Sequence, residues 1–301
     1  MRFSVWPNLM QPMDDVLGVA GHADRTGWDG VWVADHFMGD GGGFGPTESP
    51  TLEATAVLSA LAVTTERVRL GPLVLGATYR HPAVVANWAA TTDVLSGGRL
   101  VLGVGAGWQT NEHEQYGIEL PPVGDRVDRF RETCEVLDGL LRTDRTTVDG
   151  RWFQLTEALC EPKPLQDPLP LLIGGKGDRM LGIVARHADE WNMWGLPAVI
   201  AQRSAVLDQR CERIGRDPST IRRSTQALLL PTDDDAAAQR FLDAVAPRAA
   251  VAGSWDRIAQ VVGGWRDTGV DEVVVPDSPL GRGARRLELL DGLAETFAPF
   301  R

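Results

Sequence analysis

The stretch LPLLIGGKGDRMLGIVARHADEWNMW, residues 169 to 194, contains the pattern from which the fold class can be inferred. It opens with a short aliphatic run, breaks at several glycines, continues with helical spacing and closes on a second apolar run. Two short apolar runs joined by one amphipathic helix are typical of a strand–helix–strand unit with parallel strands. The stretch therefore predicts an α/β architecture if the same pattern recurs along the chain.

The same pattern recurs from one end of the chain to the other. Eight apolar runs alternate with amphipathic segments, at residues 2–6, 30–35, 68–76, 99–105, 169–175, 189–194, 223–230 and 271–277. Eight strands in 301 residues favour a closed (β/α)8 TIM barrel, with an open doubly wound sheet as the alternative. We expect one domain over residues 1–301, with a loop or hairpin insertion between the fourth helix and the fifth strand.

Composition limits the classes of function. The formal net charge of −11 argues against a nucleic-acid-binding protein, because such proteins usually carry a basic face. No apolar run approaches the span of a bilayer, and the N-terminus lacks a signal-peptide pattern. The cysteines Cys134, Cys160 and Cys211 are far apart and form no CxxC pair, which is typical of a reducing compartment. We expect a cytoplasmic protein with no nucleic-acid or membrane partner and no metal.

The glycines of the opening stretch predict an anion site. Gly174, Gly175 and Gly177 surround Lys176 at a turn from strand to helix, and Arg179 follows closely. The turn does not match a P-loop, because Lys176 precedes the last glycine and no Ser or Thr follows. Bare backbone amides at a helix N-terminus nevertheless bind phosphate, with the two cations adding charge. A turn without any ligand is the alternative.

Other unusual residues follow the predicted strands, where a barrel of this kind builds its active site. His36 follows Asp35 at the end of a strand, so its imidazole is a candidate acid–base group. Asp35 is expected either to fix the tautomer of His36 or to bind a ligand, and a purely structural histidine is the alternative. Gly107 and Trp108 end a run that fails the GxGxxG pattern, because Trp108 stands where a glycine is needed.

The position of the remaining aromatic residues and histidines relative to the predicted strands indicates which of them are candidates for the site. Trp6, Trp108, Trp191 and Trp194 collect near strand ends, and aromatic walls there suit a flat heterocycle or an apolar substrate. We expect Trp6 and Trp194 in the substrate pocket. The other histidines are weaker candidates: His22 and His187 on predicted helices, His81 at a helix start and His113 in a polar loop.

Six segments, in order, resemble the luciferase-like monooxygenase superfamily, and within it the oxidoreductases that use the deazaflavin coenzyme F420. They are GWDGVWVADHF (27–37), RLGPLVLGATYRHPA (69–83), DVLSGGRLVLGVGAGWQTNEHEQYG (93–117), VDGRWFQL with PKPLQDPLPLLIGGKG (148–177), ARHADEWN (185–192) and RDTGVDEVVV (266–275). The resemblance implies a (β/α)8 barrel that binds its coenzyme across the strand ends, in a homodimer.

The resemblance also implies roles for particular residues. It implies a coenzyme site formed by Asp35, Leu73, Val74, Gly107, Trp108, Gly174, Gly175, Lys176 and Gly177, with the phosphate on the last four. A non-prolyl cis peptide between Leu73 and Val74 is expected behind the coenzyme ring, and His36 is the candidate proton relay. In the sugar-phosphate dehydrogenase of this family an acidic residue stands where this chain has Trp108, which argues against that substrate.

The function that the resemblance implies is hydride transfer between F420 and a small organic substrate that the sequence does not identify. A reduced deazaflavin reacts poorly with oxygen, so a dehydrogenase or reductase is favoured over a monooxygenase. The alternatives are an FMN-dependent luciferase-like monooxygenase and a non-catalytic deazaflavin-binding protein.

Overall fold

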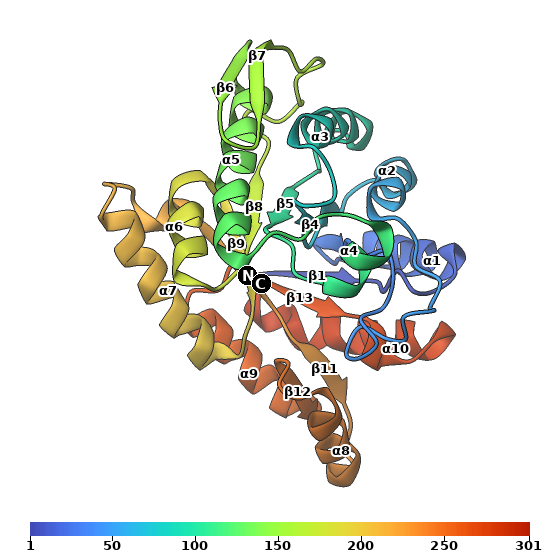
Figure 1. The fold of residues 1–301 in the computed structure, drawn as a ribbon. Coiled ribbons are helices and arrows are strands. Elements are labelled where there is room, and N and C mark those ends of the chain that lie inside the picture. Colours follow the sequence, from blue (N-terminus) through green and yellow to red (C-terminus); the bar gives the residue numbers. More distant parts are fainter.

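Parallel strands form the centre of the molecule, and helices surround them (Figure 1). The computed structural model describes residues 1 to 301. In spatial order the strands are β3 (Arg69–Pro72), β2 (Gly30–Val33), β1 (Arg2–Trp6), β13 (Glu272–Pro276), β10 (Arg222–Gln226), β9 (Glu190–Trp194), β8 (Leu171–Gly174), β5 (Leu102–Gly105) and β4 (Leu75–Gly76). β3 and β4 are two parts of the third barrel strand, and a parallel bridge from Leu70 to Leu100 joins the two ends of the sheet. The predicted (β/α)8 barrel is confirmed.

Most of the helices cover the outer face of the barrel. The helices are α1 (Met13–Arg25), α2 (Ala54–Thr64), α3 (Pro82–Ser96), α4 (Thr110–Tyr116), α5 (Val123–Arg142), α6 (Asp178–His187), α7 (Pro197–Glu212), α8 (Asp235–Val245), α9 (Trp255–Asp267) and α10 (Gly283–Phe297). Among them, α4 lies at the carboxyl ends of the strands, and α8 packs on β12 (Ala250–Gly253) outside the barrel. Because both faces of the sheet are covered, strands such as β2 and β13 are buried along their whole length. This explains why the strands are continuous apolar runs in the sequence. None of the helices combines the length and apolar composition that a membrane crossing needs.

Ion pairs fill the inside of the barrel at the amino ends of the strands. Glu272 accepts hydrogen bonds from Ser4 Oγ (2.6 Å) and Trp32 Nε1 (2.8 Å), and Arg69 bridges Glu272 and Glu190. Burial raises the pKa of Glu190, against the opposing charge of Arg69. Since this end is closed by paired side chains, a ligand that enters the barrel does so from the carboxyl ends of the strands.

The predicted seventh strand, residues 223–230, is wrong in its second half. The barrel strand β10 ends at Gln226, and β11 (Leu228–Pro231) then leaves the barrel. β11 pairs only with β12 (Ala250–Gly253), in a two-stranded parallel sheet that packs beside α8. The sequence missed this change because no Gly or Pro interrupts the apolar run, and an apolar run does not reveal which strand it pairs with.

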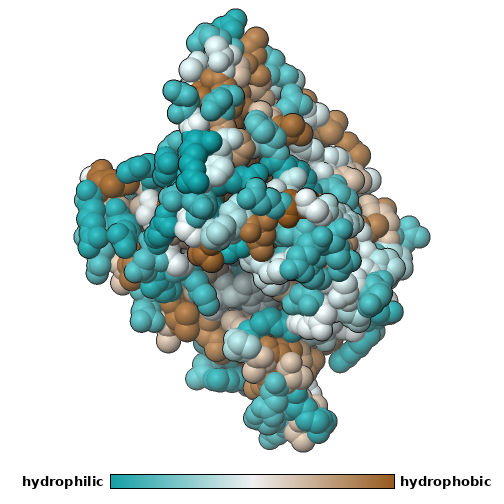
Figure 2. All heavy atoms as spheres, viewed as in Figure 1, coloured by the Kyte–Doolittle hydropathy of each residue, from teal (hydrophilic) through white to brown (hydrophobic).

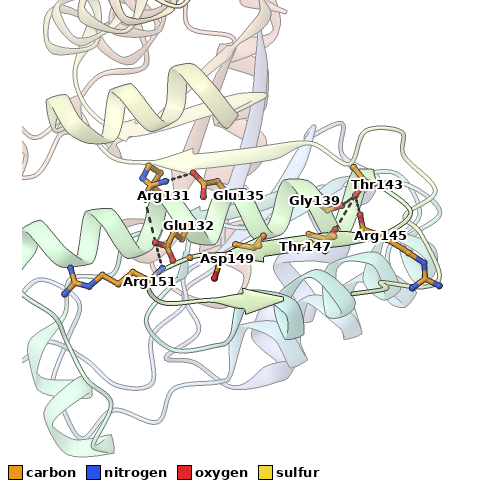
Figure 3. A pocket seen from close by; sticks show the side chains of 12 residues that line it. Arg131, Glu132, Glu135, Gly139, Thr143, Arg145, Thr147, Asp149 and Arg151 are labelled. Atoms are coloured by element: carbon orange, nitrogen blue, oxygen red, sulfur yellow. Dashed lines mark hydrogen bonds and ion pairs between the residues drawn. The ribbon is translucent and has the colours of Figure 1, made fainter. Parts of the chain in front are cut away.

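A β-hairpin lies between α5 and β8, where a loop or hairpin was expected. Its antiparallel strands are β6 (Thr146–Asp149) and β7 (Gln154–Ala158), at the top of Figure 1. A polar groove of about 590 Å³ runs between α5 and β6 (Figure 3). Most of its charges are paired within the protein: Arg131 pairs with Glu135 (2.5 Å), and Glu132 accepts the backbone N–H groups of Arg151 and Trp152. This groove lies away from the strand ends, so it is not the candidate site.

Candidate active site

A cavity of about 510 Å³ opens at the carboxyl ends of the barrel strands, and Figure 2 shows a hollow near the centre of this face. This volume is typical of a small-molecule site. The cavity brings together nearly all of the residues predicted from the sequence: Trp6, Asp35, His36, Leu73, Val74, Gly107, Trp108, Gly174, Gly175, Lys176 and Trp194. Gly177 does not line the cavity, although it is the N-cap of α6 directly beside it.

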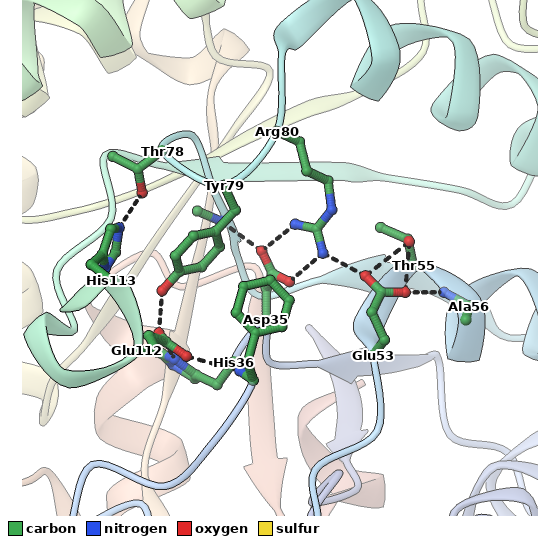
Figure 4. Close-up of polar contacts among 12 residues, drawn as sticks. Asp35, His36, Glu53, Thr55, Ala56, Thr78, Tyr79, Arg80, Glu112 and His113 are labelled. Carbon is green, nitrogen blue, oxygen red and sulfur yellow. Dashed lines mark hydrogen bonds and ion pairs between the residues drawn. The ribbon is translucent and has the colours of Figure 1, made fainter. Parts of the chain in front are cut away.

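His36 is held by a carboxylate that the sequence analysis did not assign. The Nδ1 atom lies 2.9 Å from Glu112 Oε1 (Figure 4). Because a carboxylate accepts hydrogen bonds, Nδ1 carries the proton, and the network assigns this tautomer. Nε2 has no partner in the protein. The imidazole is therefore fixed with one nitrogen available to a ligand in the cavity.

Glu112 itself is fully bonded. Its other oxygen accepts the backbone N–H of Phe37 (2.8 Å), and the Tyr79 hydroxyl donates to Oε1. Burial alone would raise the pKa of Glu112, but the hydrogen bonds from His36, Tyr79 and Phe37 outweigh burial and lower it. Burial and the Glu112 carboxylate raise the pKa of Tyr79 well above its usual value. Glu112 is thus an ionised acceptor, and Tyr79 a neutral donor.

Asp35 does not orient His36, which corrects one expectation. Its two oxygens accept from both Nη atoms of Arg80 (2.7 and 2.9 Å), and one also accepts the backbone N–H of Gly76. Arg80 in turn pairs with Glu53 (Figure 4). This bidentate ion pair uses Asp35 to anchor the third barrel strand to the second.

The third strand supplies the back wall of the cavity. The Leu73–Val74 peptide is cis, as the resemblance implied. Val74 lies so close to the neighbouring strands that a Cβ on Gly105 would be 2.7 Å from its side chain, and one on Gly174 would be 3.0 Å away. These two glycines therefore make room for Val74. Gly107 has a φ of +82°, and a side chain there would collide with Thr78.

The turn into α6 offers donors at the other end of the cavity. The backbone N–H groups of residues 176–180 have no acceptor in the protein, whereas that of Gly175 donates to Asn192 O (3.0 Å). Lys176 lines the cavity and makes no hydrogen bond or ion pair. The first helical turn and Lys176 thus form an anion-binding arrangement, while the expected contribution of Gly175 N–H is already used.

The cations at this end differ from those expected. Arg179 points away from the cavity, donating to Asp128 Oδ1 (2.5 Å) and Gly124 O. Asp178 pairs with Arg203 instead (2.6 Å). Arg126, on α5, lines the cavity without any hydrogen bond or ion pair. Sequence reasoning missed Arg126 because nothing in the helical pattern of α5 distinguishes it from the other arginines.

Aromatic side chains line the open side of the cavity. The ring centroids of Trp6 and Trp194 are 5.7 Å apart. The ring of Trp108 packs edge to face with that of His36, with their centroids 5.5 Å apart. Trp108 is 51% exposed, so it lies at the mouth. Trp191 is buried in the core, although it was grouped with these residues. The arrangement suits a flat ring or an apolar molecule.

Three residues of the site have positions that the sequence did not reveal. His113 was expected in a loop, but it lies on α4 and is buried, with Nδ1 bonded to Gln109 O and Nε2 to Thr78 Oγ1. Gln226 lines the cavity from β10, and its buried Oε1 has no hydrogen-bond partner. Glu112 stands in the segment QTNEHEQYG, and only its helical spacing from Tyr116 could have placed it on a helix.

Comparison with known proteins gives the family. The family model described as luciferase-like monooxygenase matches residues 1–253. The chain belongs to the luciferase-like monooxygenase family. A solved structure of an F420-dependent secondary alcohol dehydrogenase in complex with an F420–acetone adduct has a TM-score of 0.87 to this chain at 20% identity, over 100% of this chain and 99% of the other. At this identity the likeness shows the fold.

Two of the curated relatives carry names of different activities. An F420-dependent glucose-6-phosphate dehydrogenase of Amycolatopsis mediterranei (strain U-32) is 36% identical over 177 residues, 58% of this chain and 50% of the relative. The pyrimidine monooxygenase RutA of Cronobacter sakazakii (strain ATCC BAA-894) is 33% identical over 174 residues, 55% of this chain and 50% of the relative. The chain spans about half the length of these curated relatives.

Proposed function

We propose that this luciferase-like protein is an oxidoreductase that transfers a hydride between coenzyme F420 and a small organic substrate. One observation carries the proposal: a single cavity joins an anion-binding helix N-terminus to an imidazole with a fixed tautomer. Relatives and structural neighbours named as F420-dependent support F420 over FMN. The fold alone does not define the reaction, so the proposal depends on the residues of the cavity.

The residues of the cavity fit a deazaflavin coenzyme. Lys176, Arg126 and the first turn of α6 would hold its phosphate, because their donors have no partner in the protein. The unpaired Oε1 of Gln226 is an acceptor for an N–H group of the ring. When bound, the deazaflavin supplies the ring carbon that gives or accepts the hydride.

The protein contributes a proton relay and a dry, oriented pocket. In this proposal His36 exchanges a proton with the substrate oxygen through Nε2, while Nδ1 stays protonated on Glu112. Trp6 and Trp194 enclose the substrate and exclude water from it. Asp35 acts through the scaffold, since all of its bonds go to Arg80 and Gly76.

A coenzyme titration tests the proposal. F420 and FMN are added separately to the apoprotein, and the fluorescence of each is followed. We expect quenching of F420 at low micromolar concentration or below, and weaker binding of FMN. Tight FMN binding with no response to F420 would overturn the proposal in favour of a flavin enzyme. F420 binding without hydride exchange across a broad panel of alcohols and carbonyl compounds would instead indicate a non-catalytic carrier.

We also propose that the protein is a cytoplasmic homodimer with α2 and α3 in the interface. The only charged residue on these two neighbouring helices is Asp93, which is buried. Val63 and Val84 are 62% and 63% exposed on them, and an apolar helix face of this kind usually marks an interface. The three buried cysteines are unpaired, which supports a reducing compartment.

The homodimer is tested by solution mass. Val63→Arg with Val84→Arg should give a particle of the chain mass, 32.7 kDa, in light scattering, because two buried charges oppose association. Ile214→Arg, an exposed apolar position after α7, is the matched control and should keep the mass of the wild type. A wild-type protein that is already monomeric would refute the interface.

A further inference from the structure

A second cavity of about 320 Å³ adjoins the first at the His36 end. The two cavities share five wall residues, namely Trp6, Ala34, His36, Phe44 and Trp194. The second cavity extends away from α6, toward the Gly-rich loop 39–46 and the β11–β12 sheet. In the proposed function the coenzyme would occupy the first cavity, so a substrate whose reacting atom lies beside His36 would extend into this second space.

Arg248 is the one lysine or arginine that lines the second cavity, and no carboxylate pairs with it. Its only side-chain hydrogen bond is from Nη1 to Gly43 O (2.8 Å). The remaining guanidinium N–H groups are free. In a chain with a net charge of −11, a cation without a carboxylate partner at a cavity wall points to an anionic ligand.

The guanidinium is held in place before any ligand binds. Its carbon lies 5.9 Å from the centroid of the Phe44 ring, and the Phe44 and His36 centroids are 5.4 Å apart. Gly43 permits this approach, because a Cβ at that position would be 3.2 Å from Arg248 Cζ. Phe44 thus links the imidazole to the guanidinium within the length of a small molecule.

The other charge in this cavity is already neutralised. Asp277 is buried and pairs with Arg286 (2.9 Å), and it accepts hydrogen bonds from Asn8 N–H and Gln11 Nε2. It therefore does not compete for Arg248 or repel an anion strongly. The cavity has one net positive charge to offer, which matches a monoanion better than a phosphate dianion.

The other residues that line the second cavity indicate that the rest of the ligand is apolar. Leu9, Met10, Phe44 and Leu228 present apolar surface, and the hydroxyls of Ser49 and Ser278 have no hydrogen-bond partner in the protein. We propose that the second cavity binds the carboxylate end of the substrate through Arg248, so that the substrate is a small monocarboxylate with an apolar body. This inference rests on the proposed function for its placement of the reacting carbon beside His36.

Binding of matched probes tests the inference. Hexanoate, hexanamide and hexyl phosphate are titrated into the protein, with and without F420, and binding is measured by isothermal titration calorimetry. We expect hexanoate to bind about tenfold or more tightly than hexanamide, and hexyl phosphate to bind no better than hexanoate. Equal binding of the acid and the amide, or preference for the phosphate, would overturn the inference.

Variants tie the effect to Arg248. Arg248→Gln keeps a donor for Gly43 O but removes the charge, so it should abolish the preference for hexanoate, and Arg248→Lys should retain part of it. Arg257→Gln, on exposed α9 surface, is the matched control and should behave as the wild type. Thermal unfolding of each variant shows that it is folded. An unchanged preference in Arg248→Gln contradicts the inference.

The coenzyme arm separates this inference from the proposed function. If F420 binds with the same affinity to wild type and Arg248→Gln but hexanoate binding does not depend on Arg248, the inference fails and the proposed function stands. If F420 does not bind while hexanoate binding still depends on Arg248, the proposed function fails and the carboxylate site is supported.

Discussion

The two ends of the main cavity differ in whether their polar groups have hydrogen-bond partners within the protein. At the α6 end, Lys176, Arg126 and the backbone amides of residues 176–180 have no partners in the protein. At the His36 end, Glu112 is buried and its oxygens are fully bonded. Donors without a partner can bind a negatively charged ligand. The hydrogen-bonded carboxylate of Glu112, by contrast, fixes one imidazole nitrogen of His36 in place. The α6 end should therefore control coenzyme affinity, and the His36 end should control the reaction.

The largest effect should come from His36→Ala. Loss of the proton relay should reduce kcat by roughly 10²–10⁴-fold, while the affinity for F420 stays within a few-fold of the wild type. Turnover is followed by F420 absorbance with a substrate found in a screen of small alcohols and carbonyl compounds. His22→Gln, whose imidazole pairs with Asp291 on the outer surface, is the control and should keep full activity. A His36→Ala enzyme with undiminished kcat would remove His36 from the mechanism.

The next largest effect should be on coenzyme affinity, and it should distinguish Lys176 from the neighbouring Arg179. Lys176→Met should weaken F420 binding by roughly tenfold, and Lys176→Met with Arg126→Met by roughly a hundredfold, with kcat at saturating coenzyme nearly unchanged. Arg179→Met is the matched control, because Arg179 is bonded to Asp128 rather than facing the cavity. The measurement is a fluorescence titration with F420. An equal loss of F420 affinity in Arg179→Met and Lys176→Met would contradict the assignment of Lys176, rather than Arg179, to the coenzyme.

A smaller effect concerns the buried carboxylate. Glu112→Gln should lower the free energy of unfolding at neutral pH by about 2 kcal/mol, because an ionised acceptor of three hydrogen bonds is lost. The pKa of Glu112 is lowered in the folded protein. Its stabilising contribution is therefore complete above the unfolded pKa of about 4.3 and is lost as the pH falls through the folded pKa.

The pH dependence gives this prediction its control. Urea unfolding from pH 7 downward should show an almost constant difference between the wild type and Glu112→Gln until about pH 4.3, and convergence in stability only as the pH falls further, through the lowered pKa of Glu112. Glu114→Gln, an exposed position on the same helix α4, should match the wild type throughout. If Glu112→Gln is as stable as Glu114→Gln at pH 7, the carboxylate does not hold the network together.

The same two ends differ in how well the sequence predicted them. The α6 end follows strand β8 directly, so a local pattern of glycines and Lys176 was enough to locate it. The His36 end depends on contacts across 76 residues, from His36 to Glu112. Local spacing gives strands, helices and the residues that follow them, and it gave the barrel correctly. It does not reveal which distant carboxylate meets which imidazole.

Two errors have the same physical origin. Asp35 stands next to His36 in the sequence, yet successive side chains of an extended chain point in opposite directions, and Asp35 meets Arg80 instead. Arg179 stands one helical turn from Lys176 but faces α5. In both cases the direction of the side chain, and not its nearness in the sequence, determines which residue it contacts.

One set of F420 titrations on four proteins tests whether the α6 end of the cavity binds the coenzyme while the His36 end serves the reaction. We expect tight binding to the wild type, binding within a few-fold of it for His36→Ala and Arg179→Met, and a loss of roughly a hundredfold in the Lys176→Met, Arg126→Met double variant. Unchanged affinity in that double variant, or no F420 binding to a wild type that binds FMN tightly, would contradict this assignment of the two ends.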